Sequence, residues 1–102
     1  MSLKTINVTP VYDSTADSLT FVCFLKEDGI LVTASLTSIV LSIRDITDTE
    51  LFALSETTFT NGVAVLVKTT PGIVKNTVYY VRISFVCALG TLVSIETFVV
   101  FE

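Results

Sequence analysis

Residues 79–87 read Tyr-Tyr-Val-Arg-Ile-Ser-Phe-Val-Cys, and this stretch decides the fold class. Its odd-numbered positions are all apolar or aromatic, whereas Arg82 and Ser84 fall on the even-numbered side. Alternation with a period of two is typical of a β-strand that turns one face toward a core. The stretch therefore predicts a strand, and the rest of the chain extends the pattern.

Short alternating segments follow one another along the chain and are separated by turns. Asp28-Gly29 and Asn61-Gly62 are strong hairpin signals, and Pro71-Gly72 opens a loop. We expect strands over residues 6–12, 19–26, 39–44, 51–54, 63–68, 79–87 and 91–101, with a short irregular strand over residues 30–36 as a further candidate. About seven strands with frequent turns and no helical periodicity predict an all-β fold, a single antiparallel β-sandwich.

Composition and length support one all-β domain. Val, Ile and Thr make up 39 of the 102 residues, and β-branched side chains suit a pleated sheet better than a helix. The length predicts one domain. Pro10 cannot donate to a sheet ladder, so we expect residues 1–12 to form an edge strand or an arm and residues 13–102 to form the sandwich.

The sequence lacks the residues that most chemistry requires. No His is present, so no side chain has an ordinary pKa near neutrality for acid–base work. A net charge of −4, with six Lys and Arg in total, argues against a nucleic-acid partner. We expect no enzymatic activity, no cofactor and no small-molecule substrate.

Membrane and export signals are also missing from the sequence. The longest uncharged stretch, residues 29–43, is shorter than the roughly 20 residues that a spanning helix needs, so we expect no membrane partner. The first ten residues lack the apolar core and cleavage site of a signal peptide. We expect synthesis in the cytoplasm, followed by residence there or in a larger assembly.

One turn gathers several oxygen ligands. Asp45, Asp48 and Glu50 lie close together in sequence, and Ca²⁺ is bound by sets of such oxygens. Their spacing does not match an EF-hand, so we expect a solvated acidic turn with no bound metal.

The order of the segments resembles a known class of proteins. The chain carries, in this order, a strand into Leu25-Lys26-Glu27-Asp28-Gly29, then residues 40–45, Asn61-Gly62-Val63, residues 78–83 and residues 94–100. This order resembles the small immunoglobulin-like sandwiches of tailed-phage virions, such as capsid decoration domains and N-terminal modules of baseplate upper proteins. The late strands are also similar to those of fibronectin type III domains. The likeness spans residues 19–101 and implies an immunoglobulin-like or fibronectin-like topology.

The two cysteines depart from the antibody pattern. Cys23 and Cys87 are about as far apart as the bridged pair of antibody-type domains, but the chain has no Trp, and Phe85 replaces the tyrosine-corner Tyr. A protein made inside a cell seldom needs a disulfide. We therefore expect two free thiols that pack as small hydrophobic groups, with a Cys23–Cys87 disulfide as the alternative.

Apolar residues on both faces of the terminal segments indicate a partner surface. Phe98 and Val100 share one face of the last predicted strand, opposite Val99 and Phe101, and a domain this small cannot bury both faces alone. The interface candidates are Leu3, Ile6, Val8, Tyr12, Leu92, Phe98 and Val100.

These observations and the resemblance imply a structural role. The leading prediction is a capsid decoration or minor head protein of a tailed phage. It would reside in the virion and bind other virion proteins or copies of itself through apolar and β-edge contacts. One alternative is a tail or baseplate adaptor or fibre-attachment module. The other is a free fibronectin-like adhesion or ligand-binding domain that uses loops such as residues 69–76.

Overall fold

The computed structural model describes residues 3–87 and 92–101. These residues form β-strands and no helix, which confirms the all-β prediction. The strands are β1 (Lys4–Asp13), β2 (Ser18–Glu27), β3 (Ile30–Leu31), β4 (Leu36–Arg44), β5 (Glu50–Glu56), β6 (Val63–Thr69), β7 (Val78–Cys87) and β8 (Leu92–Val100). The described strands thus number eight where about seven were expected, and β3 has only two residues.

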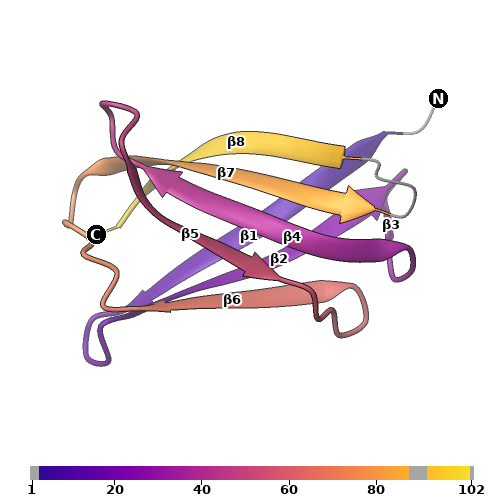
Figure 1. The fold of residues 1–102 in the computed structure, drawn as a ribbon, viewed down its shortest axis with the longest axis horizontal. Coiled ribbons are helices and arrows are strands. Elements are labelled where there is room, and N and C mark those ends of the chain that lie inside the picture. Colours follow the sequence, from indigo (N-terminus) through magenta and orange to yellow (C-terminus); the bar gives the residue numbers. More distant parts are fainter. Residues whose placement is uncertain (1–2, 88–91, 102) are drawn as a thin grey trace.

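The strands form two four-stranded antiparallel sheets. In sheet A, β2 pairs with β1 on one side and with β6 and the short β3 on the other. Sheet B has the order β5-β4-β7-β8. Figure 1 shows sheet B in front, with β1 and β2 crossing behind it at an angle. Two facing antiparallel sheets are compatible with a β-sandwich.

The two predicted hairpin dipeptides adopt the backbone that their residues favour. Asp28 and Gly29 have φ angles of 52° and 81°, and Asn61 and Gly62 have φ angles of 51° and 84°. Two successive positive φ angles are typical of the tight turns that connect antiparallel strands. Gly62 is required for a second reason, because a Cβ atom there would collide with the carbonyl oxygen of Val32.

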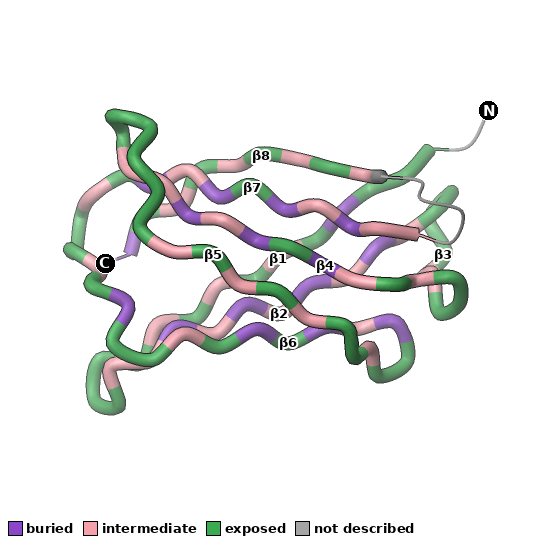
Figure 2. Tube along the Cα trace, viewed as in Figure 1, coloured by how far each residue is buried: buried purple, intermediate pink, exposed green. Residues whose placement is uncertain are grey.

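The inward side chains of both sheets form one core. Figure 2 shows buried positions alternating with more exposed ones along the central strands. The side chains of Phe21 on β2, Leu41 on β4 and Phe85 on β7 are completely shielded from solvent. The apolar alternation in the sequence therefore corresponds to burial, because each central strand turns every second side chain into the space between the sheets.

The N-terminal segment is an edge strand of sheet A in this structure. β1 pairs with β2 from Lys4 to Asp13, and Pro10 is accommodated because β1 lies at the edge of the sheet. At the start of β1, the Leu3 backbone N–H donates to Asp28 Oδ1 at 2.8 Å, and the Asp28 N–H donates to the Leu3 carbonyl at 2.7 Å. The segment is therefore held by the domain itself.

Candidate interaction surface

The outward face of sheet B changes from apolar to polar along β7 and β8. The register places Val78 opposite Val100 and Tyr80 opposite Phe98 at one end. Farther along, Arg82 lies opposite Glu96, and Ser84 lies opposite Ser94. We call the apolar end, formed by Val78, Tyr80, Phe98 and Val100, the terminal-strand patch.

Three side chains of the terminal-strand patch are exposed, and the fourth, Tyr80, is half-buried. Phe98 keeps 68% of its surface accessible, Val100 47% and Val78 38%. The Tyr80 and Phe98 rings lie with their centroids 5.0 Å apart and their planes at 58°. Aromatic pairs favour such tilted contacts, which hold each ring in a fixed position. The patch is thus a preformed apolar surface at the β8 edge of sheet B.

Farther along the same face, the polar side chains of β7 and β8 form hydrogen bonds with one another. Arg82 Nε and Nη2 donate to Glu96 Oε2 at 3.3 and 2.9 Å. The hydroxyl groups of Ser84 and Ser94 are 2.8 Å apart and hydrogen-bonded. Exposed ion pairs add little stability, so this region contributes a sharp polar boundary more than binding energy.

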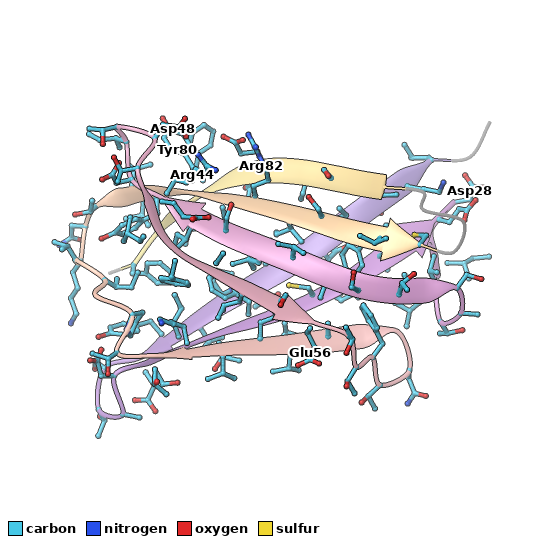
Figure 3. All side chains as sticks on the ribbon, viewed as in Figure 1. Asp28, Arg44, Asp48, Glu56, Tyr80 and Arg82 are labelled. Carbon is cyan, nitrogen blue, oxygen red and sulfur yellow. The ribbon has the colours of Figure 1, made fainter. Side chains whose placement is uncertain are left out.

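The acidic turn lies beside the terminal-strand patch and is organised by its own hydrogen bonds. Asp45 Oδ1 accepts from the Thr47 hydroxyl at 2.6 Å and from the backbone N–H groups of Thr47 and Thr49 at 2.9 and 3.0 Å. The Thr47 hydroxyl and these N–H groups lower the pKa of Asp45 because they stabilise its charged form. Asp48 pairs with Arg44 at 3.3 Å, and Figure 3 shows both near Tyr80.

The structure does not assemble the acidic residues into a metal site. Asp45 is engaged by the turn and Asp48 by Arg44, and Glu50 begins β5 in register with Arg44. Within residues 3–87 and 92–101, no group of three His, Cys, Asp or Glu side chains is placed to hold a metal ion.

The predicted interface residues of the N-terminal segment differ in their surroundings. Leu3 is 69% exposed, whereas Ile6 is buried in the core. Val8 and Tyr12 are half-buried against that core, and the Tyr12 hydroxyl donates to Asp17 Oδ1 at 2.8 Å. Ile6, Val8 and Tyr12 therefore leave the set of interface candidates, because inward-facing positions of β1 are covered by the chain's own strands.

Two candidates of the last strand fall on the outward face. Phe98 and Val100 belong to the terminal-strand patch, as described above. Leu92 begins β8 opposite Val86, and its side chain lies outside the described part of the structure.

The two cysteines are unbridged in the structure. Cys23 is buried on the inward face of β2, and Cys87 is half-buried at the end of β7. Burial raises the pKa of the Cys23 thiol to about 12, because desolvation disfavours the thiolate. Cys87 lines a cleft of about 240 Å³ together with Lys4, Leu25, Glu27, Val32, Ala34 and Ser35.

Sequence reasoning missed a second exposed apolar surface, on the outward side of sheet A. Val11, Val65 and Val67 are each at least half exposed, at 55%, 50% and 51%. Val22, Phe24 and Val63 share their face by strand alternation and register. We call the set Val11, Val22, Phe24, Val63, Val65 and Val67 the valine face. The signal was present in residues 63–67, which are apolar at odd and even positions alike.

Comparisons with protein-family models and with curated proteins identify no relative of this chain. No family model matches the chain, and no curated protein is significantly similar to it. In the part of the chain that the structure describes, no helix is long and apolar enough to cross a membrane.

Proposed function

We propose that this chain is a non-enzymatic structural protein of a tailed-phage virion, a capsid decoration or minor head protein. It binds a neighbouring shell protein through the terminal-strand patch. The observation that carries the proposal is the Tyr80–Phe98 pair on the outward face of sheet B, in which exposed Phe98 packs against half-buried Tyr80, with exposed Val78 and Val100 beside them. Aromatic side chains are enriched at protein interfaces, where they supply much of the binding energy.

The energetics of the terminal-strand patch fit a subunit that binds in many copies. Full burial of a side chain such as Phe98 contributes about 1.5–3 kcal/mol. A few such contacts give modest affinity for one copy. Repetition over a symmetric shell would raise the strength of attachment if the copies are also joined to one another, because the second contact then becomes intramolecular.

The strand order supports an immunoglobulin-like topology. The neighbours β2 and β6 of sheet A, and β4 and β7 of sheet B, are separated by other strands along the chain. Such crossings between sheets are typical of the Greek-key connections of immunoglobulin-like and fibronectin-like sandwiches. The proposed topology agrees with the resemblance of residues 19–101 to phage sandwich domains.

Mass spectrometry of density-gradient-purified particles, from cultures that carry the gene, tests the virion role. We expect peptides of this chain in the head fraction. Their presence only in separated tails supports a tail or baseplate adaptor or a fibre-attachment module instead. Absence from all particles overturns the proposal and favours the free adhesion domain.

A matched pair of variants tests the terminal-strand patch. Phe98→Lys places a charge in the patch, whereas Ile30→Lys alters a 73% exposed residue on the distant β3. We expect particles to lose the Phe98→Lys protein and to keep the Ile30→Lys protein, with both variants folded by circular dichroism. Equal retention of the two variants overturns the role of the patch.

A further inference from the structure

We infer that the valine face of sheet A binds a second copy of this chain, with the strands of the two copies stacked in opposite directions. This surface lies on a different sheet from the terminal-strand patch. The inference therefore adds self-association to the proposed virion role and does not depend on that role.

The valine face is an uncharged area between two charged ends. Outward positions of β1, β2 and β6 between Lys26 and Asp13 are all Val, Thr, Phe, Asn or Ser. Lys26 lies opposite Thr5 at one end, and Asp13 lies opposite Ser18 at the other. Exposed, contiguous apolar residues on a sheet face generally mark a protein contact.

The two charged ends are complementary to each other. A twofold axis in the plane of the face and perpendicular to the strands places Lys26 of each copy beside Asp13 of the other. A twofold axis parallel to the strands would instead place Lys26 of one copy beside Lys26 of the other. Charge therefore selects the reversed stacking, and a second copy matches both ends at once.

The other charges near Lys26 do not face this surface. Glu27 follows Lys26 and by alternation belongs to the opposite side, where it is in register with Lys4. The Asp28 carboxylate accepts a hydrogen bond from the Leu3 N–H. Lys26 is thus the charged side chain that β2 directs outward at this end, and its ammonium lies 5.7 Å from the centre of the Phe24 ring.

Side-chain size is also complementary in the reversed arrangement. The axis runs along the central row formed by Thr9, Val22 and Val65. Rotation about it lays the Phe24 row of one copy over the Thr20 row of the other, so the largest side chain meets smaller ones. Sheets that stack in this way keep their strand directions within about 30° and interlock their side chains.

The state of association of the full chain tests the inference. We expect light scattering after gel filtration to show a dimer with a dissociation constant on the order of micromolar. Val65→Lys brings two ammonium groups together at the twofold axis, so we expect dissociation to rise by at least about tenfold. Val40→Lys, at a 43% exposed outward position of β4, is the matched control and should leave the dimer intact.

A charge series tests the orientation. Lys26→Glu should weaken the dimer, because it places Glu beside Asp13 of the other copy. Adding Asp13→Asn should restore part of the affinity, since Asn keeps the oxygen that accepts from the Thr15 and Ala16 N–H groups. Circular dichroism and thermal unfolding check that every variant folds.

Three results would overturn the inference. They are a monomer at all accessible concentrations, a dimer that survives Val65→Lys but not Val40→Lys, and a Lys26→Glu variant that associates as well as the parent chain. A monomeric chain that is still found in particles would remove the self-association and leave the proposed virion role standing.

Discussion

Tyr80 on β7 and Phe98 on β8 lie opposite each other on the outward face of sheet B, with their ring centroids 5.0 Å apart. The pair belongs to no core, because the inward side chains of the same strands fill the space between the sheets. Cross-strand aromatic pairs on a sheet surface stabilise a fold by less than about 1 kcal/mol beyond their burial. The pair is therefore free to change with little effect on folding.

We expect Phe98→Ala to lower the free energy of unfolding by about 0.5–1 kcal/mol, because only the contact with Tyr80 and a partly exposed surface are lost. Phe85→Ala, at a fully buried position, should cost about 3–5 kcal/mol. Urea denaturation of both variants provides the measurement. Similar losses for the two substitutions would contradict the assignment of Phe98 to the surface.

Substitutions in the N-terminal segment should lower the free energy of unfolding according to how deeply each residue is buried. Ile6→Ala leaves a cavity in the core and should cost about 2–4 kcal/mol. Leu3→Ala, at a 69% exposed position whose hydrogen bonds come from the backbone, should change stability by less than about 0.5 kcal/mol. Removal of β1 altogether should prevent folding, and a folded, cooperative truncated protein would show that this segment is a detachable arm.

The two thiols should differ in reactivity. With its pKa raised from 9.0 to about 12, native Cys23 at pH 8 should react about 1,000-fold more slowly than an ordinary thiol on ionisation alone. Cys87 should react faster, since it lines an open cleft. A denatured, unreduced sample should show two reactive groups. The absence of reactive thiols, together with a mass deficit of two hydrogens, would establish the Cys23–Cys87 disulfide.

The acidic turn should make stability depend on pH at low values. Because hydrogen bonds lower the pKa of folded Asp45, its contribution is present above the unfolded value of 3.8 and disappears as pH falls through the folded value. Asp45→Ala should therefore destabilise the protein at neutral pH, and this destabilisation should shrink as the pH falls below 3.8. Denaturation of both proteins across this range provides the measurement, and a pH-independent difference would contradict it.

Metal addition and removal should leave the protein unchanged. The Asp45 carboxylate is occupied by the turn, and Asp48 by Arg44, so little is left to coordinate Ca²⁺. We expect the same melting temperature with chelator and with millimolar Ca²⁺. A Ca²⁺-dependent rise of several degrees, absent in an Asp45→Asn variant, would show that the turn binds metal.

The sequence by itself determined the strands, the turns and most of the core. Alternation places Tyr79 and Phe85 on one side of β7, and Asn61-Gly62 specifies a tight turn, because both properties depend on residues next to one another in the chain. The same local rule places Phe98 on the side of β8 opposite to Val99. The all-β class could therefore be read directly from the amino-acid sequence.

Only the tertiary structure decided which apolar residues are covered. Ile6 and Leu3 are similar in sequence context, yet one is buried beneath sheet B and the other is exposed. The valine face exists because β6 pairs with β2, two strands separated by much of the chain. Alternation fixes the two sides of each strand, but the side that faces water depends on contacts between distant segments, which no local pattern encodes.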